Sequence, residues 1–101
     1  MFKKIFIIAI CLFSPFIQAA KLQESRTITT ILAENNNHAG FYTSEGLDMC
    51  IWGIMFIDLS NEAGRAHLSM ALSAKLSGLK VIRMDYVVEN EKCWLKGMHI
   101  K

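Results

Sequence analysis

The chain has 101 residues, of which 11 are basic and 9 are acidic, and 52% are hydrophobic. Without Lys3 and Lys4, at the extreme N-terminus, nine residues of each sign remain, so the rest of the chain carries no formal net charge. Its basic residues are scattered along the sequence, whereas a protein that binds phosphate backbones carries a basic surplus on one face. The composition therefore argues against nucleic-acid binding.

Residues 1–19 predict an export signal. The two N-terminal lysines form a positive region, residues 5–13 are continuously apolar, and Pro15 interrupts a helix. The small residues Ala19 and Ala20 suit a signal peptidase. We expect cleavage after one of these alanines and a mature protein that is periplasmic or secreted.

Two other interpretations of this N-terminal segment fit less well. A membrane span needs about 20 apolar residues, and Ser14 and Pro15 end the apolar run before that length is reached. A lipoprotein site needs a small residue before its cysteine, but Cys11 follows Ile10. We therefore expect no stable membrane insertion once the signal is removed.

Residues 20–101 are long enough for one small domain, which buries little surface and is marginally stable without a covalent link. Cys50 and Cys93 are the cysteines that remain after cleavage, and export places them in an oxidising compartment. A redox pair or a metal site is the alternative, but the C-x-x-C spacing and a set of four clustered ligands are both missing from the sequence. The sequence favours a structural disulfide, which on the chain-entropy model stabilises the domain by about 4 kcal/mol.

The first half of the domain predicts three strands. Residues 27–33 are rich in β-branched side chains, and residues 35–40 form an asparagine- and glycine-rich turn. Residues 41–44 make a short second strand. Residues 49–57 are almost continuously apolar, as in a central strand that is covered on both faces. Gly53 within this run indicates a bulge or the close approach of another backbone.

A helix is predicted over residues 62–77. Asp58, Ser60 and Asn61 precede it and offer side-chain oxygens that can cap its first turn. Gly78 follows the last helical residue and is expected to end the helix in the left-handed conformation.

Two more strands are predicted at residues 80–88 and 93–100, around a turn at residues 89–92. The element order is then β-β-β-α-β-β, which is an α+β, mainly β arrangement with one disulfide. This order is that of the small five-strand barrel called the OB-fold. A helix packed on an open antiparallel sheet is the alternative.

The second half of the domain resembles the cell-binding B subunits of enterotoxin-type pentameric toxins, which have the OB-fold. The shared features are a capped helix, a strand, a charged turn and a cysteine beside a tryptophan. The first cysteine departs from the toxin pattern because Cys50 lies far from the mature N-terminus, so no sugar-binding residue is transferred. The chain also resembles small exported bacterial proteins of mostly unassigned function, through Asp58, Leu59, Ser60, Gly64, Ala66, Ser69, Leu72, Ala74, Lys75, Ser77, Gly78, Val81, Tyr86 and Cys93.

No catalytic arrangement is evident in the sequence. His67 and Ser69 are two residues apart on the predicted helix and face different directions. The sequence contains no nucleophile elbow, zinc-protease motif or phosphate-binding loop. His38, His67 and His99 are dispersed, which argues against a metal site. We expect no cofactor.

The aromatic residues offer the candidate ligand-binding positions. Trp52 and Phe56 share a face of the predicted third strand, and we expect both in the core. Phe41 and Tyr42 point to opposite faces of the second strand, so one of them should be exposed and is the candidate ligand-facing position.

The predicted helix has two apolar stripes where a surface helix normally has one. One stripe, with Ala63, Ala66, Met70, Ala71 and Ala74, is expected to face the barrel. The other, with Leu68, Leu72 and Leu76, is a candidate interface for a second copy of the chain. Alternatively, the polar residues 21–26 cover this second stripe, or the three leucines are simply exposed. If residues 21–26 do not cover the helix, they form a loose leader or the edge of the first strand.

Taken together, these features predict an exported, non-enzymatic binding or interaction module for a protein or glycan ligand. The second hypothesis is a periplasmic inhibitor or immunity-type protein. The third, a small secreted enzyme, has no reactive constellation in its favour.

Overall fold

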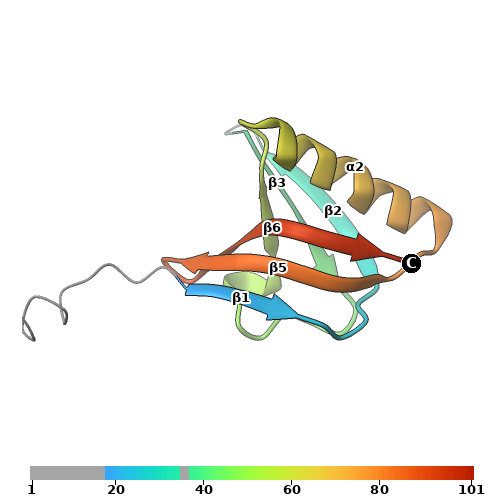
Figure 1. Ribbon diagram of the computed structural model, residues 1–101, viewed down its shortest axis with the longest axis horizontal. Coiled ribbons are helices and arrows are strands. Elements are labelled where there is room, and N and C mark those ends of the chain that lie inside the picture. The colour runs from blue at the N-terminus through green and yellow to red at the C-terminus, as the bar shows by residue number, and fades with distance from the viewer. Residues whose placement is uncertain (1–17, 35–36) are drawn as a thin grey trace, which may run out of the picture.

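The computed structural model describes residues 18–34 and 37–101, as a curved sheet with one helix lying across it (Figure 1). The predicted export signal lies outside the described residues except for Gln18 and Ala19, which begin the first strand. The elements are β1 (Gln18–Leu22), β2 (Ile28–Glu34), β3 (His38–Thr43), the short 3₁₀ turn η1 (Ile51–Gly53), β4 (Met55–Asp58), α2 (Glu62–Ser77), β5 (Val81–Glu89) and β6 (Lys92–Ile100).

The described strands form one six-stranded sheet in the order β1-β5-β6-β4-β3-β2. All neighbours are antiparallel except β4 and β6, which are parallel. The sheet is not closed into a barrel, although Arg26, between the two edge strands, pairs with Val81 through two backbone hydrogen bonds of 2.8 Å. The prediction of a mainly β domain with one helix and one disulfide is confirmed. The predictions of a five-strand barrel and of a purely antiparallel sheet are wrong.

The predicted element order is also wrong, because the described residues include a strand before β2 that was not expected. β1 pairs with β5, with Ala20 opposite Tyr86 and Leu22 opposite Met84. Ala20 and Leu22 pack against the core while Lys21 is exposed. Such a short alternation gives almost no sequence signal, and the pairing depends on backbone groups that every residue carries.

The predicted third strand is shorter than expected, because β4 covers only its last three residues and then Asp58. Trp52 and Gly53 adopt positive φ angles of 58° and 69° in η1, a conformation that cannot continue a strand. Gly53 has no neighbouring atom within 4 Å of the position that a Cβ would take, so the predicted close approach is wrong and the residue serves the turn. The predicted second strand begins earlier than expected, at His38, because that residue pairs with both Glu34 and Asp58.

The helix prediction is confirmed at both ends. Asn61 is the N-cap residue, and its side-chain oxygen accepts a hydrogen bond of 2.7 Å from the backbone N–H of Gly64. Gly78 has a φ of 69°, and the N–H groups of Gly78 and Leu79 both bond to the carbonyl oxygen of Ala74. These two hydrogen bonds end the helix, and glycine favours them because it readily adopts the left-handed conformation.

The core lies between the concave face of the sheet and the helix. α2 contributes Ala71 and Ala74, which are completely buried, and these small side chains let the helix approach the sheet closely. Ala63 and Ala66 are exposed, so the predicted inward stripe is correct only for its later residues. The largest fully buried side chains of the core are those of Phe41, Leu47, Met55, Ile57, Met84, Val81 and Cys93.

The predicted disulfide is confirmed. Cys50 and Cys93 are bonded, with their Cα atoms 5.3 Å apart, and both residues are buried. The bond joins the segment that precedes η1 to the start of β6. It therefore fixes η1 beside the turn between β5 and β6, where the backbone N–H of Ile51 also donates a hydrogen bond of 2.9 Å to the carbonyl oxygen of Glu91.

Candidate functional site

The face of the sheet opposite the core, called here the outer face, carries an aromatic cluster. Successive strand residues point to opposite faces, so Trp94 points outward between the buried Cys93 and Leu95. Phe56 lies opposite Trp94 in the β4–β6 pairing, and their ring centroids are 5.4 Å apart. His38 meets Trp94 edge-on, with 5.0 Å between the centroids.

Gly40 allows Ile54 and the Met55 backbone to pack closely beside this cluster. It lies opposite Phe56 on the other side of β4, and a Cβ at this position would stand 2.9 Å from the Ile54 side chain and from the Met55 carbonyl oxygen. Ile54 and Phe56 are packed to 7% and 6% exposure. The cluster is thus a tightly packed platform. Trp94 is half-buried in it and keeps part of its surface accessible.

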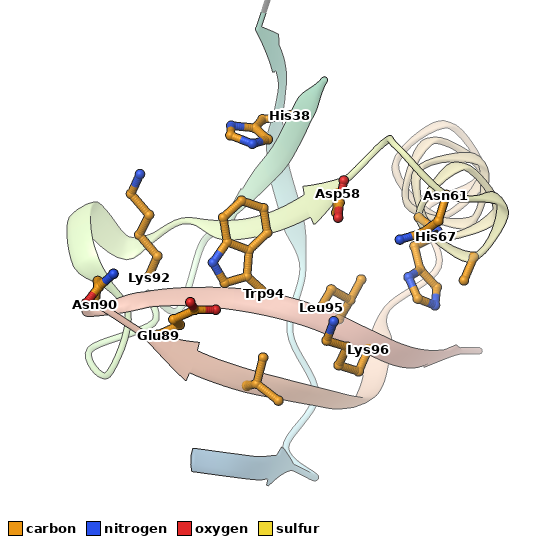
Figure 2. A pocket seen from close by; sticks show the side chains of 13 residues that line it. His38, Asp58, Asn61, His67, Glu89, Asn90, Lys92, Trp94, Leu95 and Lys96 are labelled. Atoms are coloured by element: carbon orange, nitrogen blue, oxygen red, sulfur yellow. Dashed lines mark hydrogen bonds between the residues drawn. The ribbon is translucent and has the colours of Figure 1, made fainter. Parts of the chain in front are cut away.

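A groove of about 520 Å³ runs along this platform. Figure 2 shows Trp94 near its middle, Asn90 and Lys92 at one end and Asn61 and His67 at the other. The volume falls within the range of roughly 300–1,000 Å³ that small-molecule sites occupy. One aromatic side chain is therefore surrounded by hydrogen-bonding groups in a hollow of ligand size.

The first end of the groove is formed by the tight turn between β5 and β6. Asn90 and Glu91 have φ angles of 52° and 67°, as in the two-residue turns that fit the twist of a hairpin. The turn pairs Glu89 with Lys92 and brings both side chains to the groove. The Lys92 ammonium lies 5.6 Å from the centre of the Phe56 ring, a distance at which a cation is attracted to the ring face.

The second end of the groove is formed by the connection from β4 to α2. The Asp58 carboxylate accepts hydrogen bonds from the Ser60 hydroxyl (2.6 Å) and the Ser60 backbone N–H (2.9 Å). These bonds, and after them the proximity of His38 and Lys96, lower the pKa of Asp58 from its ordinary value. The carboxylate is therefore ionised at neutral pH and is held by its neighbours in one orientation.

His67 completes the second end. Its Nδ1 atom is buried and has no hydrogen-bond partner among the described residues. Burial, and after it the charge of Lys96, lowers the pKa of His67 below its ordinary value. The imidazole is therefore mainly neutral at pH 7, and His67 lines the groove.

The groove has balanced charges. Asp58 and Glu89 are negative, Lys92 and Lys96 are positive, and the remaining polar groups are the amides of Asn61 and Asn90 and the two imidazoles of His38 and His67. Among the described residues no three His, Cys, Asp or Glu side chains are grouped so that they could hold a metal ion. The lining offers donors and acceptors in similar number around one indole ring.

The predicted ligand-facing pair lies elsewhere. Phe41 is completely buried in the core, whereas Tyr42 is 36% exposed on the outer face of β3. The expectation that one of the two is exposed is confirmed, and Tyr42 is that residue. It does not line the groove. Phe41 cannot contact a ligand without a change in the core.

The structure separates the three leucines of the predicted interface. Leu68 is half-buried and packs against the core. Leu72 and Leu76 are 42% and 85% exposed at the other end of α2, where Leu79 is also exposed. The exposed apolar surface is therefore limited to the C-terminal part of the helix, and its contact with a second copy remains a prediction.

Trp52, which was expected in the core, is the most exposed tryptophan of the described chain. It is 65% exposed in the middle of η1. The prediction failed because a continuous apolar run was interpreted as one buried strand. Trp94 was not predicted as a site residue either. Its position next to Cys93 in a strand of alternating burial was the one feature of the sequence that could have indicated that it faces away from the core.

Within residues 18–34 and 37–101, no helix is both long and apolar enough to cross a membrane. The disulfide is compatible with an oxidising compartment outside the cytoplasm. Comparison of the chain with protein-family models, with curated proteins and with solved structures gave no match.

Proposed function

We propose that the chain is an exported, non-enzymatic binding module that holds a neutral saccharide in the outer-face groove. The observation that carries this proposal is the placement of Trp94 in a groove of balanced charge. An indole ring provides a flat apolar surface for the C–H face of a sugar ring. The amides, carboxylates and ammonium groups around it supply the paired donors and acceptors that sugar hydroxyls require.

The charge of the groove argues against other ligand classes. A phosphate or another strong anion needs a local excess of positive groups, but Asp58 and Glu89 offset Lys92 and Lys96. A purely apolar ligand would leave the charged and amide groups of the lining without partners, which costs free energy. A hydroxyl-rich, uncharged ligand satisfies both conditions. The toxin resemblance expected from the sequence is compatible with a glycan ligand but does not carry this proposal.

A glycan array probed with the oxidised protein tests the proposal. Asn90→Gly removes one amide from the groove while keeping a residue that accepts the positive φ of the turn, so it should weaken binding without unfolding the domain. Trp94→Phe should weaken it as well. Tyr42→Ala is the matched control, because Tyr42 is an exposed aromatic residue outside the groove. Failure of the wild type to bind any glycan would refute the proposal.

A second candidate, an inhibitor or immunity-type protein, has the η1 loop in its favour. The loop is exposed at its tip, and the disulfide and the Ile51–Glu91 hydrogen bond hold it in place, as is required of a segment that inserts into an enzyme. Recovery of one enzyme with the wild type but not with Trp52→Ala would support this function instead.

A further inference from the structure

We propose that Trp52 forms a second aromatic subsite next to the groove, so that the domain binds a chain of sugar units rather than a single one. This inference rests on the proposed function of the groove. It concerns a residue that lines no part of the groove itself.

The backbone at Trp52 is unusual. A φ of 58° is rare for a bulky side chain, and residues in such conformations occur where the surrounding structure enforces them, often at binding sites. Here the enforcing contacts are the Cys50–Cys93 bond and the backbone hydrogen bonds Gly53 N–H to Cys50 O (3.0 Å) and Ile54 N–H to Ile51 O (3.3 Å). They hold an indole in solvent, where burial does not stabilise it.

The loop is attached to the end of the groove. Cys93 stands between Lys92 and Trp94, which both line the groove, and its Cα is 5.3 Å from that of Cys50. Trp52 follows Cys50 by two residues, so its Cα lies within roughly 13 Å of that of Cys93. In Figure 2 the pale green turn of η1 lies on the side of Lys92 and Asn90, away from His67. A ligand that extends past the β5–β6 turn therefore meets η1 next.

Charge and area favour a sugar unit over other occupants of this position. The adjoining turn carries Glu89 and Glu91, both exposed, which oppose attachment to an anionic lipid surface. Trp52 is a single exposed side chain, whereas a stable protein interface buries about 800 Å² on each partner. A single indole ring is, however, enough to stack one sugar ring.

The two tryptophans allow the subsites to be observed separately, because the chain contains only these two. In Trp52→Phe the remaining emission comes from Trp94, and in Trp94→Phe it comes from Trp52. Both variants are titrated with mono- to hexasaccharides of the β-1,4-linked glucose and N-acetylglucosamine series and of the galactose series. We expect monosaccharides to change Trp94 emission alone and longer chains to change the emission of both residues.

Affinity provides the second measurement. In the wild type the affinity should rise with chain length, and Trp52→Ala should remove this rise, lowering the affinity for the longest chain by about tenfold while leaving that for the monosaccharide unchanged. Leu76→Ala, a similarly exposed apolar position on α2, should keep the rise.

The failures can be told apart. If oligosaccharides change Trp94 emission but leave Trp52 emission and the effect of chain length untouched in every variant, the second subsite is wrong and the groove proposal stands. If no saccharide changes Trp94 emission, both are wrong. If Trp52 emission responds to phosphatidylcholine vesicles or to a co-purified protein and not to saccharides, the loop serves that partner and the inference is overturned.

Discussion

Replacement of Gly64 by alanine should destabilise the domain, although alanine is the better helix former. Gly64 is buried in the first turn of α2, and an added Cβ would overlap the carbonyl oxygen of Asp58 and stand 2.7 Å from the carbonyl carbon. This carbonyl belongs to the last residue of β4, which is paired with His38 and cannot rotate away. The helix itself must therefore move.

The magnitude follows from two opposing effects. Alanine gains about 1 kcal/mol over glycine through helix propensity alone. Moving the start of the helix loosens the contacts of Ala71 and Ala74 in the core, and overpacking of this kind typically costs about 1–3 kcal/mol or more. It also strains the bond from the Gly64 N–H to Asn61. We expect a net loss of about 1–2 kcal/mol, or a decrease in Tm of roughly 4–16 °C for a domain of this size.

Urea unfolding followed by far-ultraviolet circular dichroism measures this change. Ser73 is an exposed position on the same helix, so the pair Ser73→Gly and Ser73→Ala supplies the control: there alanine should be more stable than glycine by about 1 kcal/mol. The reasoning is refuted if Gly64→Ala is as stable as the wild type, because the helix would then not rest on the Asp58 carbonyl.

Four further changes have expected outcomes. Cys93→Ala should lower the free energy of unfolding by about 2–5 kcal/mol, and the wild type should show no reactive thiol from Cys50 or Cys93 in non-reducing denaturant; two reactive thiols would contradict the bond. Gly78→Val should cost at least about 1 kcal/mol in thermal unfolding, since a β-branched residue at a φ of 69° is strained, and a neutral result would place the helix end elsewhere. Leu72→Glu should convert an oligomer to a monomer in light scattering with its circular dichroism unchanged, a prediction that a monomeric wild type would defeat. Because the folded pKa of His67 is lowered, the contribution of His67 to stability should be constant above about pH 6.5 and should be lost as the pH drops through the folded pKa. His67→Gln should reduce the loss of stability between pH 7.5 and 5.0, and an unchanged loss would contradict this assignment.

The parts of the fold that were predictable depend on local signals. Asn61, the helical run and Gly78 lie within one segment, and each acts on the backbone beside it, so the helix could be delimited from sequence. The disulfide was predictable because two cysteines remain after the expected signal.

The candidate site depends on contacts that no local pattern encodes. Trp94 becomes part of a platform because the parallel pairing of β4 with β6 brings Phe56 beside it. Trp52 was misplaced for the opposite reason: its apolar neighbours indicated burial, while the turn that exposes it is enforced by a covalent bond to a distant residue.

The edge pairing of β1 has a consequence for the order in which the domain forms. Most of the chain separates Leu22 from its partner Met84, so β1 is synthesised long before β5 exists, whereas β2 and β3 are separated by a short connection. Contacts between distant segments are slow to form because a long loop must first be closed. The hairpins β2–β3 and β5–β6 and the helix should therefore form early, and the N-terminal strand should be the last to dock onto the sheet.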